Sequence, residues 1–407
     1  MKFIADLHIH SRFSIATSSQ LTPPMLDLWG RKKGIGVVGT GDATHPGWFA
    51  ELKDSLVPFG NGLFRLKPSL RHKEAASYAS EPVSFILSAE ISCIYKRDGK
   101  VRKVHNLVFA PRISDFSKIQ CDLEKVGNIR SDGRPILGLD SRDLLEIVLN
   151  VNEDAFLVPA HIWTPWFSVL GSKSGFDTIE ECYGDLSRHI FAVETGLSSD
   201  PAMNAKCSFL DRYALVSNSD AHSPENLGRE ANLFDTEMSY ESIVKALKGK
   251  SKGFLGTIEY FPEEGKYHLD GHRKCGVCLE PHETKRLKGI CSVCGKPLTL
   301  GVLNRVTQLA DRKEIDGARK KFYSMTPLRN VLAEMLGVKP GSKKVTEQYE
   351  RLLKALGSEL EILIEVPLEE IASVDTLLSE GIRNLRRGEV QLGGGYDGEY
   401  GSVRVYE

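Results

Sequence analysis

The sequence predicts an α/β protein whose parallel strands form either a barrel or a doubly wound sheet. Residues 1–260 alternate short apolar runs with stretches of helical pattern, which is the rhythm of strand–helix–strand units. Most of the apolar runs end in, or border, a His, Asp or Glu, and six of the eleven histidines occupy such positions. Because the active site of an α/β barrel is built at the carboxyl ends of its strands, this placement favours the barrel.

The first apolar run, residues 2–7, leads directly into two histidines. His8 and His10 are two positions apart, so a strand presents both imidazoles on one face. The later runs border acid and imidazole side chains in the same way: Asp42 and His45 after 36–41, Glu90 after 83–89, His105 before 106–109, His161 after 156–160, and Asp220 and His222 after 215–219.

These nine side chains together predict a polynuclear metal site. A single residue of this kind at the end of a strand is usually an ordinary surface or core residue. Nine are different, because buried carboxylates and imidazoles cost much free energy unless they are paired or bind a cation. All the ligand atoms are nitrogen or oxygen, which suits Zn, Mn, Fe or Mg better than a site that selects for sulfur.

The helical segments and the domain limits follow from the remaining pattern. Helices are predicted over 21–33, over 141–150 with Ser141 as the cap, and over 240–248. After residue 301 the pattern is mainly helical, with helices predicted over 315–323, 328–336, 345–356 and 367–380, and a glycine-rich loop between short strands at 393–401. A chain of 407 residues predicts more than one domain, and we divide it into a catalytic α/β domain (1–260), a small metal-binding module (261–300) and a helical C-terminal region (301–407).

Four of the eight cysteines form two closely spaced pairs. Cys275 and Cys278 are separated by two residues, as are Cys291 and Cys294, and this spacing predicts one structural zinc with four thiolate ligands. The other four, Cys93, Cys121, Cys182 and Cys207, are interpreted as buried free thiols. Clustered cysteines, no run of 18 apolar residues and no signal-peptide pattern predict a cytoplasmic protein with no membrane partner.

The charge of the chain is balanced overall but not along its length. The net charge is −1, whereas residues 265–331 hold 14 Lys and Arg against 6 Asp and Glu, a local excess of 8. A basic patch of this kind can hold phosphates even when the whole chain is neutral, and a solvated basic face is the alternative. The cysteine module has two corresponding interpretations: it contacts DNA, or it only connects the neighbouring domains.

The nine acid and imidazole side chains resemble the pattern of the polymerase and histidinol phosphatase (PHP) superfamily. The resemblance implies a distorted seven-stranded (β/α)7 barrel that hydrolyses phosphoesters with two to three divalent metals (Zn, Mn or Mg). By that pattern His8, His10, Glu90 and Asp220 hold one metal, Glu90 bridges to a second held by His105 and His161, and Asp42, His45 and His222 complete a third. Two departures, Ala16 in place of a further His and the spacing between Asp42 and His45, both affect the third metal.

The whole layout resembles the endonuclease Q family. The residues that carry this resemblance are 5–11, 39–48, 194–201 and the cysteine quartet. Membership implies a DNA repair endonuclease that cuts on the 5′ side of a deaminated base (uracil, hypoxanthine or xanthine) or an abasic site. Such an enzyme must extrude the base and read its carbonyl with hydrogen-bond donors. A sliding clamp is a further candidate partner, although the tail 402–407 matches no clear clamp-binding peptide.

The segment that follows His161 offers aromatic side chains and a polar, glycine-flanked loop beside the metals. We interpret it as part of the base pocket, with ordinary loop packing as the alternative for each residue, and Arg12 as a phosphate contact or a surface residue. The candidate contacts are Arg12, Trp163, Trp166, Ser172, Lys173, Ser174 and Gly175. Two other functions remain open: a small-molecule phosphatase of the histidinol-phosphatase type, and a DNA-binding or scaffold protein with no activity.

Overall fold

The computed structural model describes residues 1–78, 81–312 and 320–406. Its main sheet has eight strands in the order β16-β13-β12-β1-β2-β5-β4-β3, and a second sheet has four in the order β8-β6-β7-β9. The strands of the main sheet are β1 (Lys2–Asp6), β2 (Val37–Gly39), β3 (Leu56–Phe59), β4 (Leu63–Leu66), β5 (Ser84–Ile86), β12 (Ala231–Asp235), β13 (Phe254–Tyr260) and β16 (Lys321–Met325). The other strands are β6 (Ser88–Arg97), β7 (Lys100–Phe109), β8 (Ile136–Leu137), β9 (Phe156–Pro159), β10 (Ala192–Glu194), β11 (Ala214–Val216), β14 (Asp270–His272), β15 (Val277–Leu279), β17 (Gln391–Gly393) and β18 (Ser402–Arg404).

The expectation of parallel strands is met only in part. β1, β2 and β5 are parallel neighbours, and so are β10 and β11. By contrast, β6 pairs antiparallel with β7, and β7 pairs antiparallel with β9. The reason is a tight turn at Asp98 and Gly99, both with positive φ, which joins β6 and β7 into a long hairpin. Glu90 and His105 therefore lie within strands rather than after them.

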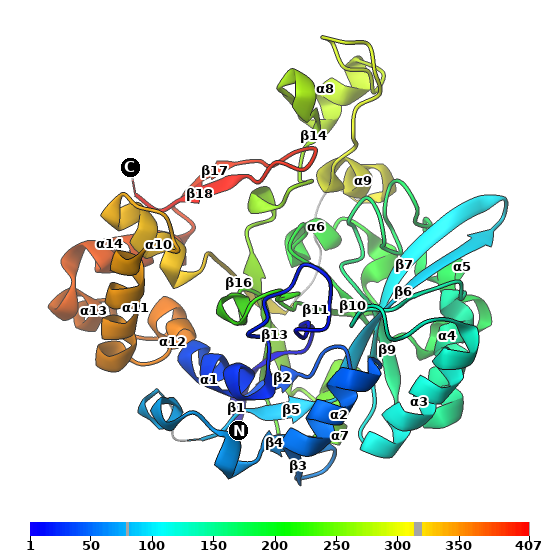
Figure 1. Cartoon of the computed structure of the whole chain (residues 1–407). Coiled ribbons are helices and arrows are strands. Elements are labelled where there is room, and N and C mark those ends of the chain that lie inside the picture. Colours follow the sequence, from blue (N-terminus) through cyan, green and yellow to red (C-terminus); the bar gives the residue numbers. More distant parts are fainter. Residues whose placement is uncertain (79–80, 313–319, 407) are drawn as a thin grey trace.

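Helices cover the outside of the sheets and build the C-terminal region (Figure 1). In the first part they are α1 (Pro23–Lys33), α2 (Pro46–Ser55), α3 (Ile113–Val126), α4 (Ser141–Val151), α5 (Ile179–Tyr183), α6 (Pro201–Asn204) and α7 (Tyr240–Leu247). The later helices are α8 (Pro281–Arg286), α9 (Val302–Leu309), α10 (Leu328–Leu336), α11 (Lys343–Leu356), α12 (Glu359–Ile364), α13 (Leu368–Val374) and α14 (Thr376–Arg387).

Three details of the predicted helices are wrong. The cap of α4 is Asp140, whose side chain accepts from the N–H of Arg142, and not Ser141. The helix predicted over 367–380 is two helices, because Asp375 has an extended backbone and caps α14 with its carboxylate. The helix predicted over 315–323 ends in the strand β16, which pairs with β13, and its residues 315–319 lie outside the described part.

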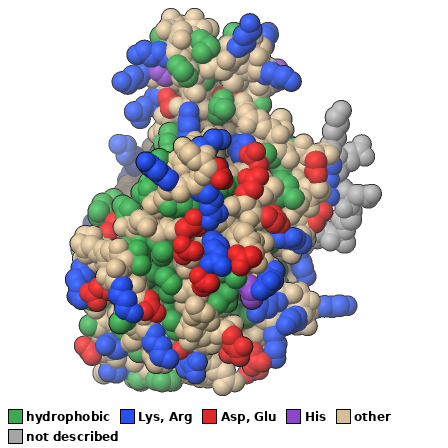
Figure 2. Space-filling model, turned by 90° about the vertical axis from the view of Figure 1, so that its right-hand side faces the viewer, with side chains coloured by type: hydrophobic (Ala, Val, Ile, Leu, Met, Phe, Trp, Pro, Cys, Tyr) green, Lys and Arg blue, Asp and Glu red, His purple; other side chains and the backbone are tan. Residues whose placement is uncertain are grey.

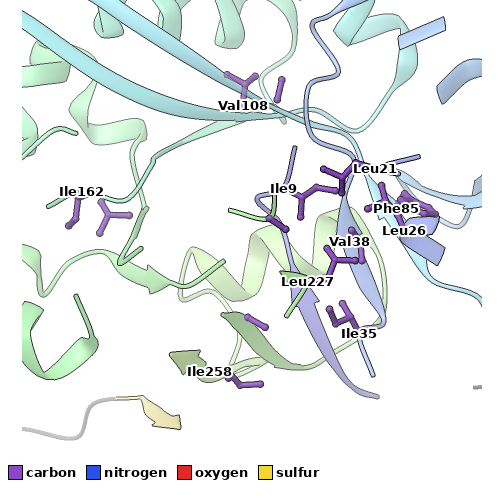
Figure 3. Packing of buried hydrophobic residues seen from close by; sticks show 14 of the residues in the cluster. Ile9, Leu21, Leu26, Ile35, Val38, Phe85, Val108, Ile162, Leu227 and Ile258 are labelled. Carbon is purple, nitrogen blue, oxygen red and sulfur yellow. The ribbon is translucent and has the colours of Figure 1, made fainter. Parts of the chain in front are cut away.

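The core beside the first strands is closely packed. Figure 3 shows Ile9, Leu21, Leu26, Val38 and Phe85 close together, and each is almost fully buried. Burial of one such side chain contributes about 1.5–3 kcal/mol to stability. This packing fixes β1 and β2, and therefore the segments that follow them.

Polar contacts link the C-terminal helices to α1. The buried Lys33 at the end of α1 forms an ion pair of 2.6 Å with the buried Glu359 of α12. The hydroxyl of Tyr349 donates to the same carboxylate, and Lys32 pairs with Glu350 on α11. The cysteine module lies far from these helices, at the top of Figure 1, and the β17–β18 hairpin reaches toward it. Among the described residues no helix is long and apolar enough to cross a membrane.

Candidate metal centre

The structure brings six of the nine predicted metal ligands into two adjoining groups. His8, His10 and Asp220 form the first, and Glu90, His105 and His161 form the second. In each group the candidate ligand atoms lie within 4.8 Å of one another. Segments separated by more than 200 residues meet here because β1 and β11 end side by side, with the N–H of Asp220 donating to the carbonyl of His8.

Glu90 lies between the two groups and faces both. Its Oε2 is 3.3 Å from Nε2 of His10 and 3.6 Å from Nε2 of His8. Its Oε1 is 2.6 Å from Nδ1 of His105 and 3.3 Å from Nε2 of His161. One carboxylate thus offers a different oxygen to each group, which is the geometry that a ligand shared by two cations requires.

Three buried atoms at this point approach other candidate ligand atoms without forming a hydrogen bond in the described part of the chain: Nε2 of His10, for example, lies 3.0 Å from Oδ1 of Asp220. Nε2 of His8, Nε2 of His10 and Oδ1 of Asp220 are buried and make no hydrogen bond among the described residues. Polar atoms left in this way cost free energy, and a bound cation would compensate them. The residues therefore fit a metal.

The electrostatics of the pocket also favour cations. Burial alone would lower the pKa values of His8 and His10, but the neighbouring carboxylates raise both well above the usual value. In contrast, burial lowers the pKa of His105 to about 4 despite the nearby Glu90. Four carboxylates, those of Asp42, Glu90, Glu194 and Asp220, surround these imidazoles, and the guanidinium of Arg134 lies 3.1 Å from Oε2 of Glu90.

Two carboxylates orient the histidines of the first group from behind. Glu194 accepts from Nδ1 of His8 at 3.0 Å, and from the N–H of His161. Asp42 lies 3.1 Å from Nδ1 of His10 and also accepts from the hydroxyls of Ser11 and Ser14. Such contacts fix the tautomer of a ligating imidazole and direct its other nitrogen toward a metal.

Three of these residues share an unusual backbone. Asp42, His161 and Asp220 have φ values of 47°, 29° and 47°, in the left-handed region that residues with side chains rarely adopt. Strain of this kind persists where the surroundings impose it and is concentrated at functional sites.

The predicted third metal group is not assembled. Both nitrogens of His45 have protein partners: Nε2 donates to the carbonyl of Arg130, and Nδ1 accepts from the N–H of Trp48 to cap α2. His222 lies at the edge of the first group, 34% exposed, with its ring 4.7 Å from that of His10. No group of candidate ligands within the described ranges combines Asp42, His45 and His222.

The loop predicted to bind a base does lie beside the second group. The carbonyl of Phe167 accepts from the N–H of His105, and its ring is 4.8 Å from that imidazole. Trp166 is 38% exposed and meets Tyr267 edge to face at 5.6 Å. The hydroxyl of Ser172 is buried without a partner in the part of the chain that is described.

The other residues of that prediction have different places. Trp163 is buried and donates to Asn204, so it packs inside the domain and does not line a pocket. Ser174 is buried, accepts from the N–H of Phe167 and shapes the loop with Gly175, whereas Lys173 is exposed. Arg12 is a surface residue paired with Glu51.

The sequence analysis missed two residues of the site. Arg134 is 3.1 Å from Oε2 of Glu90, but it lies in a loop with no periodic pattern that could have identified it. Glu194 ends an apolar run, as the predicted ligands do, so the same rule could have found it.

The cysteine module holds a second kind of group. Cys275, Cys291 and Cys294 lie with His272, all ligand atoms within 4.8 Å, whereas Cys278 is exposed and outside this group. Cys278 is therefore the one predicted zinc ligand that the structure does not bring to this group. Of the four scattered cysteines, Cys121 is exposed, so the prediction that all four are buried is wrong for that residue. Figure 2 shows Lys and Arg side chains projecting from this module at the top, above a barrel face where both charges mix. The exposed lysines and arginines of the module are Lys266, Arg273, Lys274, Lys285, Arg286, Lys288 and Lys296.

Comparisons with known proteins agree with this arrangement. The chain resembles the crystal structure of a lesion-specific endonuclease, PfuEndoQ from Pyrococcus furiosus, with a TM-score of 0.87 and 32% identity over 100% of this chain and 96% of that one. It matches equally well, over 97% of that chain, a structure of endonuclease Q in complex with a 27-mer duplex substrate that has an abasic lesion at the active site.

Curated relatives cover different shares of their own length. YqxK of Bacillus subtilis, an uncharacterized protein, is 29% identical over 99% of both chains. MJ0043 of Methanocaldococcus jannaschii, also uncharacterized, is 32% identical over 269 residues, which is 63% of this chain and 33% of MJ0043. Residues 327–389, which include all of α10 to α14, match the family model of the MJ0043 C-terminal domain. With 32% identity to PfuEndoQ over almost its full length, the chain belongs to the endonuclease Q family.

Proposed function

We propose that the protein is a metal-dependent DNA repair endonuclease that cuts the phosphodiester on the 5′ side of a deaminated base or an abasic site. The observation that carries this proposal is Glu90, which directs one oxygen to each of two groups of ligands. The match to endonuclease Q bound to a duplex with an abasic lesion supports DNA as the substrate.

The proposed fold of the catalytic domain is a distorted seven-stranded barrel. β5 runs into β6 with one residue between them, and hydrogen bonds beyond the strand ends connect the remaining neighbours. The N–H of Ile162, which follows β9, donates to the backbone carbonyl of Glu194 in β10. The N–H of Asp220, which follows β11, donates to the backbone carbonyl of His8, which follows β1. These contacts support a ring of β1, β2, β5–β6, β7, β9, β10 and β11.

Two divalent cations, Zn, Mn or Mg, are proposed for the barrel, and one structural zinc for the cysteine module. His8, His10 and Asp220 would hold one cation, His105 and His161 the other, and Glu90 both. Bound cations of this kind polarise a phosphate and make water acidic enough to attack it near neutral pH. The third metal of the family pattern has no such support, because His45 is occupied on both nitrogens.

The protein's own side chains have separate tasks in this reaction. Glu194 and Asp42 hold the imidazoles of His8 and His10 in place. Arg134, a quarter exposed beside Glu90, is positioned to contact a non-bridging oxygen of the scissile phosphate. Trp166 and Ser172 offer a stacking surface and a hydroxyl to an extruded base. The exposed lysines and arginines of the cysteine module would contact the duplex on either side of the lesion.

A nicking assay tests the proposal directly. Labelled duplexes that contain uracil, hypoxanthine, xanthine or an abasic site, and an undamaged duplex, are incubated with the full-length protein and Mn²⁺ or Mg²⁺. The expected result is one cut on the 5′ side of each lesion and none in the intact duplex. Equal cutting of all duplexes would contradict lesion specificity. Hydrolysis of histidinol phosphate without cutting of DNA would instead support the small-molecule phosphatase.

A further inference from the structure

The cysteine module contains two copies of one short motif, which does not coincide with the two pairs of closely spaced cysteines. Residues 291–295 read Cys-Ser-Val-Cys-Gly, and residues 272–276 read His-Arg-Lys-Cys-Gly. In both, a ligand residue is followed after two positions by a cysteine and then by a glycine. Cys278 stands outside this repeat and is followed by Leu279 in a strand.

Both copies end in a glycine with a left-handed backbone. Gly276 and Gly295 have φ values of 64° and 69°, so each turn ends in the left-handed conformation that glycine adopts without strain. The N–H of Gly276 donates to the carbonyl of Arg273, and the N–H of Gly295 donates to that of Cys291. Each copy thus ends in a turn at its glycine, closed by a hydrogen bond that spans three residues in the first copy and four in the second.

The strand pairing directs Cys278 away from this point. In the hairpin of β14 and β15, His272 pairs with Val277, and Gly271 pairs with Cys278. Directly opposed residues of an antiparallel pair share a face, and successive residues alternate between faces. His272 and Cys278 therefore project from opposite faces of the hairpin.

The face that carries Cys278 is covered by another part of the chain. A Cβ atom at Gly271 would be 2.3 Å from the ring of Tyr396, so this ring packs on that face. Tyr396 belongs to the glycine-rich loop between β17 and β18, and it bridges to Leu269. Cys278 thus lies beside the ring of Tyr396 and not with the other three thiols.

The geometry points to a zinc ion held by His272, Cys275, Cys291 and Cys294, with Cys278 left as a free thiol. Nδ1 of His272 is 3.4 Å from Sγ of Cys294, and all four ligand atoms lie within 4.8 Å of one another. Zinc–sulfur bonds of about 2.3 Å place tetrahedral ligands about 3.8 Å apart, so little movement is needed to bind the ion. This inference does not depend on the nuclease activity.

Cobalt substitution of the full-length protein counts the thiolate ligands. Co²⁺ in the barrel has nitrogen and oxygen ligands, so near-ultraviolet charge-transfer absorption from sulfur to cobalt reports on the cysteine module alone. The variants are Cys278→Ser, His272→Cys and the control His282→Ala, an exposed histidine of the same module. Cys278→Ser and the control should keep the absorption of the wild type, and His272→Cys should raise it by about one third, from three thiolates to four. Loss of about a quarter in Cys278→Ser, or no rise in His272→Cys, would overturn the inference.

Thiol labelling of the native, zinc-loaded protein gives an independent test that needs no variant in the module. The exposed Cys121 is removed first by Cys121→Ser, with circular dichroism as the check of folding. One rapidly labelled thiol per chain should remain, and peptide mapping should identify it as Cys278. Labelling of Cys278 only after zinc is removed would contradict the assignment.

Discussion

The proposed barrel and the cysteine module both gather candidate metal ligands, but they do so in opposite ways. The barrel draws its ligands from segments as distant as His8 and Asp220, buries them and surrounds them with carboxylates. The module draws its ligands from 23 consecutive positions, 272–294, and leaves Cys294 exposed. The distant set shares one carboxylate between its two groups, whereas the local set is a compact group of four that would hold one zinc and stabilise a segment too small to form its own core.

Loss of the shared carboxylate of Glu90 should have the largest effect, because it should abolish nicking while leaving the zinc of the cysteine module bound. Glu90→Gln removes the charge that both barrel groups use, and transition-state stabilisation by metals amounts to several kcal/mol, so nicking should fall by roughly 10³-fold or more. The zinc of the module should stay bound, as measured by metal analysis after dialysis. The control Glu153→Gln, at an exposed position, should cut like the wild type. Full activity of Glu90→Gln would show that the barrel group is not the catalytic centre.

Removal of an orienting carboxylate should weaken the barrel site without abolishing it. Glu194→Gln retains a hydrogen-bond partner for His8 but loses its charge, and changes of this type cost about 10- to 100-fold in metal affinity or activity. A titration of nicking against Mn²⁺ should therefore shift to higher concentrations, with activity recovered at saturation. An unchanged titration curve would remove Glu194 from the site.

Arg134 and Arg12 give a matched pair of arginines, one at the metal groups and one on the surface. Arg134→Gln should lower nicking about tenfold or more, because a charge-assisted hydrogen bond to phosphate is worth about 1.5–3 kcal/mol. Arg12→Gln should have no effect, since Arg12 is paired with Glu51 at the surface. Metal content separates the two roles of Arg134: if the variant also loses barrel metal, the residue holds Glu90 and does not contact the phosphate.

The smallest expected effect concerns stability, and it arises from the buried carboxyl group of Glu259, which is not a candidate metal ligand. Burial raises the pKa of Glu259 to about 8, and the carboxylate accepts hydrogen bonds from the hydroxyls of Thr195 and Ser217. The folded state therefore retains a proton that the unfolded state releases near pH 4.5, so stability should fall as pH rises from about 5 to 8. One proton is worth at most about 1.4 kcal/mol per pH unit.

Denaturant unfolding between pH 5 and pH 8 checks this effect. The free energy of unfolding of Glu259→Gln should change less with pH than that of the wild type over this range. The variant should therefore become more stable relative to the wild type as the pH rises. The control Glu237→Gln, on the surface, should follow the wild type. Parallel curves for wild type and Glu259→Gln would contradict a proton held at this position.

Sequence patterns predicted the parts of the molecule that follow from local rules. The alternation of apolar runs located β1, β2 and β9, and the residues after them, because a strand end and its ligand are neighbours in the chain. The tail was also predicted correctly, as a glycine-rich loop between two short strands, β17 and β18. The family pattern supplied Glu90 as the shared ligand, and the geometry of its two oxygens supports that role.

What the sequence analysis missed depends on partners far away in the chain. The two nitrogens of His45 are occupied by Arg130 and Trp48, and no spacing rule shows that. Trp163 is buried because Asn204 accepts from its indole, and Arg134 reaches Glu90 from an irregular loop. In the module, the spacing of Cys275 and Cys278 gave no sign that β14 pairs with β15. This pairing directs Cys278 away from the group that contains Cys275.

Anomalous diffraction from crystals of the full-length protein grown with Mn²⁺ tests the central claim most directly, because it locates the barrel cations without relying on activity. Two manganese peaks are expected, one beside His8, His10 and Asp220 and one beside His105 and His161, with one oxygen of Glu90 bound to each. Peaks at Asp42 and His45 instead, or a single peak that Glu90 does not contact, would contradict the account.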